Sequence, residues 1–400
     1  MPSQSTWVEQ LDQAVDANQQ LMVEVRRHLH AYPEVSGEEV QTTRYLSEQL
    51  REHGFDMRVG PEGRGLIVDL PAKPGSRVAL RGDIDALRIQ DAKSVDYRSR
   101  TQGVMHACGH DAHAAVVLGA LVSLSQSAKS LGIDLPIRGV FQPAEESNTG
   151  ALEMIDAGAL NGVTAILGLH MDPKRRVGTI GYRRGAFTAD CDEMHIDIRG
   201  RGGHASRPHE VVDPIAAAAQ MINSIYLFTP RVIDSHDPVV VSIGRINGGE
   251  SYNVIPDHVE LLGTLRSFGG EIRQRTKDHI AQLARGIAEV SDTTISVEFT
   301  AGPPSVYNDA KLNEVVRTSA VELLGREHVH AIERPSMGGE DFAHYLAHVP
   351  GAMFRLGCAP SDESAPPLHS ADFDIDERAL SVGANILARS VLNLLEAKQE

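Results

Sequence analysis

The sequence predicts an α/β fold in which a mostly parallel sheet carries most of the chain and a smaller, ferredoxin-like α+β domain is inserted into it. In the first third, short continuous apolar runs alternate with helical segments, as in parallel sheets that helices cover on both faces. After about Thr188 apolar and polar residues alternate instead, which is typical of strands with one wet face. Near the C-terminus the first pattern returns.

The elements of the first pattern are delimited by proline and glycine. The segment 112–127 is apolar nearly all round, so we expect a buried helix there. The remaining expected elements are helices at 21–30, 43–53, 311–324 and 377–395, and strands at 66–70, 77–81, 137–141, 165–169 and 353–356.

The alternating part has the order strand, helix, strand, strand, helix, strand, which is the ferredoxin-like split unit. Its helices are expected at 213–228, with Asp213 as N-cap and Pro214 at the first position, and at 271–290. Its strands are expected at 194–198, 239–246, 259–266 and 294–299. We therefore predict one domain from 1–187 and 303–400, and a second domain, 188–302, inserted in it.

Composition excludes several classes of protein. The 400 residues include 38 Lys and Arg against 54 Asp and Glu, a net charge of −16 that repels nucleic acid. No apolar run is long enough to span a bilayer, and the segment 1–7 has neither a basic nor an apolar part of a secretory signal. Three cysteines form no disulfide framework, so we expect the reducing cytoplasm.

Metal-binding residue types follow the expected strands, where α/β sheets form their ligand sites. These residues are Asp83 and Asp85, Glu145 and Glu146, His170, and the pair Cys108 and His110 at the start of the buried helix. Each alone has an ordinary explanation, as a cap, an exposed loop pair, a structural histidine or an inert thiol. Those explanations do not predict convergence on one sheet edge.

Thiolate, imidazole and carboxylate together favour zinc or a first-row neighbour. Adjacent Glu145 and Glu146 point in different directions, so one can bind metal while the other acts as general base. The spacing does not say which does which. Other catalytic motifs are weak. The run 200–205 imitates a dinucleotide-binding loop, but Pro208 and Pro214 delay the helix that such a loop requires.

These residues resemble the metal-dependent amidohydrolases that include hippurate hydrolase, N-acyl-amino-acid amidohydrolases and auxin–amino-acid conjugate hydrolases. They are a branch of the aminoacylase-like co-catalytic metallopeptidase group. The resemblance runs from Arg26 to Ser370, and its strongest motif is 103–111, GVMHACGHD. Further motifs follow in the family's order: QPAEE at 142–146, GLH at 168–170, GGHAS at 202–206, NVIP at 253–256 and GGEDF at 338–342.

The resemblance implies a role for each motif. Five residues match ligands of two divalent metals: Cys108, which bridges them, His110, Glu146, His170 and His369. Glu145 matches the general base, and Asp85 a carboxylate that orients a ligand. The inserted domain matches a lid that commonly dimerises. Its His204 matches a residue that stabilises the oxyanion in a neighbouring active site, and its Asn253 and Arg266 match residues that hold the substrate carboxylate.

The expected reaction is hydrolysis of the amide between an acyl or aroyl group and an amino acid, with Mn, Zn, Co or Ni as the metal. The rivals are a metallo-aminopeptidase or carboxypeptidase acting on free peptides, and a metal-loaded binding protein without activity. Two of the departures from the family pattern bear on the substrate. Arg88 replaces a usual proline, and the loop 90–102 is unusually charged, which leaves the preference for an acyl group open.

Overall fold

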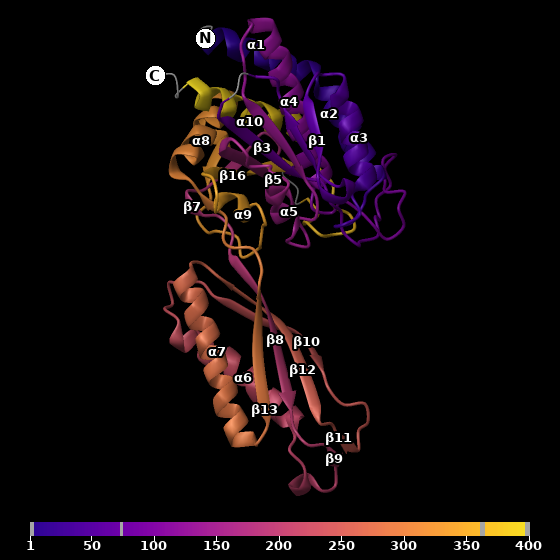
Figure 1. Ribbon diagram of the computed structural model, residues 1–400, viewed down its shortest axis with the longest axis vertical. Coiled ribbons are helices and arrows are strands. Elements are labelled where there is room, and N and C mark those ends of the chain that lie inside the picture. Colours follow the sequence, from indigo (N-terminus) through magenta and orange to yellow (C-terminus); the bar gives the residue numbers. More distant parts are fainter. Residues whose placement is uncertain (1–3, 73–74, 361–364, 397–400) are drawn as a thin grey trace. The chain divides into compact units, whose positions relative to one another are not determined.

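The computed structural model describes residues 4–72, 75–360 and 365–396, so the first three residues of the N-terminal segment considered above lie outside it. The chain forms two compact units (Figure 1). The first unit comprises Met1–Phe187, Val306–Arg334 and Glu340–Glu400. The second unit comprises Thr188–Ser305 and Pro335–Gly339. Each unit is described by itself.

The first unit is an α/β structure built on an eight-stranded, mostly parallel sheet of order β1-β2-β4-β3-β5-β16-β6-β15. The four central strands, β4, β3, β5 and β16, pair in parallel. The strands are β1 (Asp56–Val59), β2 (Leu66–Asp69), β3 (Arg77–Asp83), β4 (Ile137–Gln142), β5 (Val163–Arg176), β6 (Ile180–Tyr182), β15 (Val329–Ala331) and β16 (Gly351–Ala359). A two-stranded sheet pairs β7 (Gly185–Ala186) with β14 (Tyr307–Asn308).

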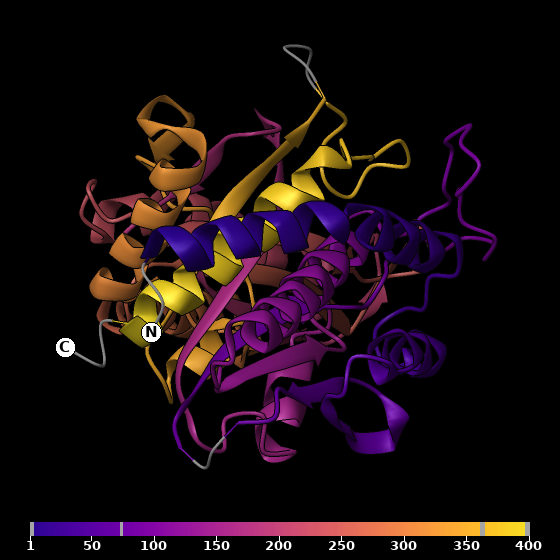
Figure 2. The ribbon, with the colours of Figure 1, turned by 90° about the horizontal axis from the view of Figure 1, so that it is seen from above.

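Helices cover both faces of this sheet because its strands are apolar on both sides. In β3, Val78 and Leu80 pack in one core while Ala79 packs in the other. The larger core lies under α1 (Gln4–Ala17), α2 (Gln19–Ala31), α4 (His110–Leu131), α8 (Ala310–Leu324) and α10 (Arg378–Glu396). Figure 2 looks onto this layer, where α1, α4 and α10 pack together. The smaller core lies under α5 (Gly150–Asp156) and α9 (Ala343–Leu346), and α3 (Val40–Arg51) precedes β1.

The expected buried helix is α4, which begins at His110 directly after Gly109. Gly109 has φ +88°, a left-handed conformation that glycine adopts without strain. Among the described residues α4 alone is long and apolar enough to cross a membrane, and 78% of that stretch is buried inside the unit. The burial identifies it as the core helix that the sequence predicts.

The second unit is a four-stranded antiparallel sheet of order β10-β12-β8-β13 with two helices. Its elements are β8 (Asp190–Arg199), α6 (Pro214–Val232), β10 (Val240–Asn247), β12 (His258–Ser267), α7 (Gly270–Ser291) and β13 (Thr294–Ala301). Apolar residues of α6 and α7 pack on Met194, Ile196 and Ile198 of β8. As predicted, Asp213 caps α6, since its carboxylate accepts the amides of Ile215 and Ala216.

The short elements of the two units complete the fold. In the second unit β9 (Gly203–His204) pairs with β11 (Val254–Ile255), and a 3-10 turn occurs at Pro208–Glu210. The 3-10 turns at Pro61–Gly63 and Arg326–His328 belong to the first unit. The strand that we expected at 165–169 is much longer, because β5 continues to pair with β16 as far as Arg176. His170 therefore lies within a strand, and not after it as the sequence suggested.

Candidate metal centre

Three neighbouring strands and one helix of the first unit deliver the predicted ligands. β3 runs into Asp83 and Asp85, the turn after β4 carries Glu145 and Glu146, and β5 carries His170. Cys108 and His110 stand at the N-terminus of α4, which packs against β3, β4 and β5. The loop before α10 supplies His369, whose amide donates to the carbonyl of Ala107.

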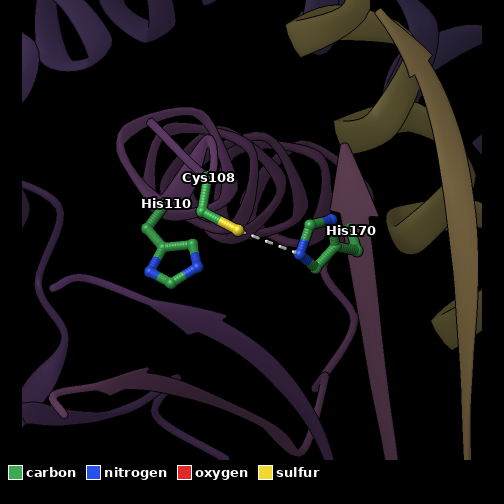
Figure 3. Close-up of side chains that lie close together, drawn as sticks. All are labelled: Cys108, His110 and His170. Atoms are coloured by element: carbon green, nitrogen blue, oxygen red, sulfur yellow. Dashed lines mark hydrogen bonds between the residues drawn. The ribbon is translucent and has the colours of Figure 1, made fainter. Parts of the chain in front are cut away.

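Cys108 belongs to two ligand groups. In one, the ligand atoms of Cys108, His110 and His170 lie within 4.8 Å of one another, and Figure 3 shows both rings beside the thiol. In the other, Cys108 lies within the same distance of Glu146 and His369. The thiol Sγ is 3.5 Å from His170 Nε2, and His369 Nε2 is 3.3 Å from Glu146 Oε1. A thiolate shared by two groups is the arrangement that a bridging ligand requires.

Neighbouring side chains orient two of these ligands. Asp85 Oδ1 accepts a hydrogen bond from His110 Nδ1 at 3.0 Å, while its Oδ2 accepts from the hydroxyl of Ser36 and the amide of Glu146. His170 Nδ1 donates to the carbonyl of Met171 at 2.8 Å. In both rings Nδ1 is used, so Nε2 is left to bind a metal. Asp85 thus holds two ligand segments together.

Buried polar atoms without partners show that the residues fit a metal. Within the described ranges, His110 Nε2 and Glu146 Oε1 are buried, make no hydrogen bond and lie 3.9 Å apart, and His369 Nε2 is the ion-pair neighbour of Glu146 Oε1. Unsatisfied buried polar atoms are costly, and a cation between them removes the cost. His113, by contrast, is no ligand, because Nδ1 binds Asp83 and Nε2 accepts the amide of Met171.

Electrostatics in the cluster also favour cations. Burial raises the pKa of the Cys108 thiol to about 12. Burial alone would lower the pKa of His110, but Asp83, Cys108 and Asp85 together outweigh it and hold that pKa well above its usual range. Burial and then Arg355 keep the pKa of His170 well below its usual range, so this ring is neutral. Thiolate formation at Cys108 therefore needs positive charge nearby, which bound metal supplies.

Glu145 lies in a pocket of negative charge. Its carboxylate is within 4.8 Å of those of Glu340 and Asp341, and its Oε2 is 3.9 Å from His110 Nε2. Burial, then Glu340 and Asp341, raise its pKa well above the usual range. Arg81, fully buried, donates to both Glu340 and Asp341 and keeps this corner of the site folded. A carboxyl with a raised pKa is suited to move a proton.

The backbone that presents these groups is strained at two positions. Ala144, next to Glu145, has φ +53°, and the ligand His369 has φ +63°, a region that residues other than glycine rarely adopt. The turn after β4 also requires Gly150, since a Cβ there would lie 1.6 Å from the carbonyl oxygen of Pro143. The amide of Ala144 donates to Glu39. These contacts hold the turn that carries Glu145 and Glu146.

The loop 90–102, singled out for its charge, is anchored by two buried residues. Asp91 accepts the amides of Lys93 and Ser99, and Lys93 Nζ donates to the carbonyl of Phe373 at 2.9 Å. Lys93 also contacts His30 Nε2 at 2.8 Å. Arg88 is exposed and lies 3.5 Å from Glu38. The loop is thus fixed from inside the fold.

The other predicted site residues belong to the second unit. His204 and Asn253 are neighbours, since Val254 pairs with His204 and the amide of Ala205 donates to the carbonyl of Asn253. Arg266 pairs with Cys191 at the far end of β8 and donates to the carbonyl of Met337. Figure 1 shows β9 and β11 beyond the opposite end of these strands. The unit therefore separates Asn253 from Arg266 by the length of β12, about 27 Å at 3.4 Å per residue.

Sequence reasoning gave no role to the corner formed by Arg81, Glu340 and Asp341. The motif at 338–342 carries both acids, but nothing in its spacing relates it to Glu145, some two hundred residues earlier. Only the place of this motif in the family's order of motifs indicated that the two acids have a function. The parallel sheet makes the connection, because Arg81 of β3 and Gln142 of β4 both bind Asp341.

A cluster of thiol, imidazole and carboxylate ligands beside a free carboxyl, on the edge of a parallel sheet, defines a metal-dependent hydrolase with two divalent metals. The chain belongs to peptidase family M20/M25/M40, whose sequence profile matches residues 79–393. Members of this family that resemble the chain include amidohydrolases, and the chain is one of these metal-dependent enzymes.

Individual relatives cover nearly the whole chain. N-acetyl-L-cysteine deacetylase of Bacillus subtilis is 37% identical over 95% of this chain and 89% of its own length. Thermostable carboxypeptidase 1 of Saccharolobus solfataricus is 36% identical over 96% of this chain and 98% of its own. A solved structure, a dinuclear metal-binding M20 peptidase of Bacillus subtilis, is 35% identical with a TM-score of 0.81, covering 95% of this chain and 99% of that one.

Proposed function

We propose that the enzyme hydrolyses the amide bond of N-acyl amino acids, with an acetyl or aroyl group, and releases a carboxylic acid and an amino acid. The observation that carries this proposal is the free carboxyl of Glu145 beside two ligand groups that share Cys108. The deacetylase among the relatives supports the substrate class.

Cys108, His110, Glu146, His170 and His369 hold two divalent ions, of Mn, Zn, Co or Ni. When bound, these ions polarise the substrate carbonyl and activate water. Glu145 accepts the proton of the attacking water and passes it to the leaving amine nitrogen, while Asp85 keeps His110 and Glu146 in position. The bridging thiolate requires a reducing compartment, so we place the enzyme in the cytoplasm.

The second unit, with the domain predicted at 188–302, serves in this proposal as an inserted lid and dimerisation domain. His204 stabilises the oxyanion, while Asn253 and Arg266 hold the substrate carboxylate. Asn253 precedes β11, beyond the end of β12 opposite Arg266, so the two are farther apart than one N-acyl amino acid can reach. One substrate therefore meets Arg266 of one copy together with His204 and Asn253 of another.

Exposed apolar side chains on the second unit support a homodimer. Tyr226, Leu227 and Phe228 of α6 are 44–60% exposed, and Ile246 of β10 is 59% exposed. β10 is the edge strand of its sheet, with backbone groups available for pairing with a second copy. Apolar side chains next to an open edge are typical of an interface.

The test replaces Glu145 with alanine. We expect Glu145→Ala to abolish turnover of N-acetyl and N-benzoyl amino acids while metal analysis still finds about two ions per chain, since Glu145 is no ligand. Glu38→Ala, which removes an exposed glutamate of the same unit, is the matched control and should keep full activity. A Glu145→Ala enzyme with unchanged kcat would refute the assignment of the base.

A peptidase is the second candidate, because a close relative is named a carboxypeptidase. A substrate panel separates the two: N-acetyl and N-benzoyl amino acids against free dipeptides, each with the enzyme loaded with Mn, Zn, Co or Ni. Faster cleavage of free dipeptides would favour the peptidase. Loss of all amide hydrolysis with every metal would instead favour a metal-binding protein without activity.

A further inference from the structure

The histidine proposed for the lid has one ring nitrogen already engaged. His204 Nδ1 receives the backbone amide of Ser206 at 3.1 Å and lies 2.8 Å from the Ser206 hydroxyl. A backbone N–H can only donate, so Nδ1 must present its lone pair to it. The hydroxyl, which can donate or accept, then donates to the same nitrogen.

This arrangement determines the tautomer of the neutral ring. A neutral imidazole carries one proton, and since Nδ1 is the acceptor, the proton lies on Nε2. Within the described ranges Nε2 makes no hydrogen bond, and the residue is exposed. The opposite tautomer would set an Nδ1–H against the amide N–H of Ser206, two donors facing each other.

Hydrogen bonds and close packing fix the backbone around Ser206, and with it the direction of the Ser206 amide. His204 pairs with Val254 across β9 and β11, and the amide of Arg207 donates to the carbonyl of His204 at 2.9 Å, which closes a turn around Ser206. Gly202 and Gly203 allow close packing, since a Cβ on Gly203 would lie 2.5 Å from Val211 Cγ1. The amide of Ser206 is therefore directed at His204 Nδ1.

We propose that Ser206 is a positioning residue, whose amide and hydroxyl hold the His204 ring in the tautomer that presents Nε2–H as a hydrogen-bond donor. The inference rests on the oxyanion role proposed for His204 and adds the reason why the ring is competent for it. A donor stabilises a developing oxyanion, whereas a lone pair on Nε2 would repel it.

The tautomer can be read without any activity assay. Full-length protein with 15N-labelled histidine rings gives long-range proton–nitrogen spectra that distinguish a protonated Nε2 from a protonated Nδ1. The His204 signals are assigned by their loss in His204→Ala. At about pH 8, where ordinary imidazoles are neutral, we expect the Nε2–H form alone in the wild type. A protonated Nδ1 there would overturn the proposal.

Three substitutions extend the test to the reaction. Ser206→Ala keeps the amide and loses the hydroxyl, so we expect kcat to fall about 2- to 10-fold, with KM nearly unchanged. Ser206→Pro removes both donors, since proline has no N–H, and should give mixed tautomers and a fall in kcat approaching the 10²-fold of a lost oxyanion donor. Ser206→Thr keeps both groups and should restore the wild-type tautomer and kcat.

The outcomes separate this inference from the function on which it rests. If His204→Ala retains wild-type kcat, the oxyanion role is wrong, whatever the tautomer. If His204→Ala is impaired but Ser206→Pro keeps both the Nε2–H signal and full kcat, Ser206 is not the positioning residue. Should Ser206→Pro fail to fold, the wild-type spectrum and Ser206→Ala still decide. Ser235→Ala, at an exposed serine of the same unit, controls for unspecific loss.

Discussion

Besides burial, two carboxylates from a distant part of the sequence raise the pKa of Glu145. Glu340 is the largest electrostatic cause of its raised pKa after burial, and Asp341 follows. The pKa of Asp341 is itself raised to about 8 by burial, because Arg81 only partly offsets the loss of water. The site therefore gathers four carboxyls around one guanidinium, since Arg81 also binds Asp83, and it keeps a proton available.

Glu340→Gln tests this electrostatic role. Removing the negative charge lowers the pKa of Glu145, so the base becomes deprotonated at lower pH and the acidic limb of kcat/KM moves to lower pH. A pH–rate profile of the loaded enzyme measures the shift. Glu333→Gln, at an exposed glutamate of the same unit, should leave the profile unchanged. A limb that stays in place would show that Glu340 does not influence the base.

Residue types and their positions after strands predicted most of the residues that the structure brings together, because thiol, imidazole and carboxylate seldom occur together by chance. His369 came only from the resemblance to the family, and the residues alone left open which of Glu145 and Glu146 is the ligand. Sequence could not reveal which nitrogens remain available. His113 follows His110 by only three residues, one turn further along α4, but its two nitrogens are both used. That distinction depends on a backbone amide of β5, which no spacing in the sequence encodes.

At the scale of elements, Arg26 connects α2 to α4 and to the segment before α10. Its buried guanidinium binds Asp111 in the first turn of α4, at 3.0 Å, and also Asp374 and Glu377. Burial would raise the pKa of Asp111, but Arg26, His30 and His106 together outweigh it and hold that pKa far below its usual range. The helix that presents His110 is thus tied down one residue after the ligand.

Arg26→Met should destabilise the fold by about 3–5 kcal/mol, since it leaves the Asp111 carboxylate buried without its partner. Arg27→Met is the matched control: Arg27 also binds Glu377, but its side chain is half exposed, so we expect a loss below about 1 kcal/mol. Urea denaturation of both variants measures the difference. Equal midpoints would mean that Arg26 contributes no more than a surface pair.

Long helices with a clear apolar period were predicted well. Very short strands, and strands extended by pairing with distant segments, were not. The helix expected at 271–290 is α7, Gly270–Ser291, because its apolar residues repeat with the helical period. Only five of the fourteen residues of β5 were expected, since Met171 to Arg176 are kept in the strand by pairing with β16, which comes far later in the chain. β6 and β15 have three residues each, too few for a pattern to show.

At the scale of the whole molecule, the separation of Asn253 from Arg266 leads us to predict that active sites are completed between two copies of the chain. If sites are completed between copies, Glu145→Ala and His204→Ala chains should complement each other. A mixed dimer then has one intact site, so equal co-expression should recover about a quarter of wild-type activity. Gel filtration with light scattering checks that both variants form dimers.

The control for this experiment pairs Glu145→Ala with Glu146→Ala. Both residues lie in the first unit, so a mixed dimer has no intact site and should stay inactive. If the Glu145→Ala and His204→Ala mixture is equally inactive although mixed dimers form, the sites are not shared between copies. The role of His204 would then need another explanation.

Sequence could not show that 335–339 joins the second unit. This short piece lies between residues of the first unit, but the carbonyl of Gly338 accepts the amide of Ala189, and Met337 accepts Arg266. Such contacts between distant segments leave no periodic trace. The α/β class, by contrast, followed from apolar runs alone, since strands covered on both faces must be continuously apolar.

The raised pKa of Cys108 has a consequence for the life of the enzyme before it acquires metal. Oxidants and alkylating agents attack the thiolate, and a buried thiol with a pKa of about 12 is almost entirely neutral at physiological pH. A newly made chain can therefore wait through metal scarcity with its bridging sulfur intact. Because the thiol is also buried, we expect chains without metal to react slowly with peroxide and alkylating agents at Cys108.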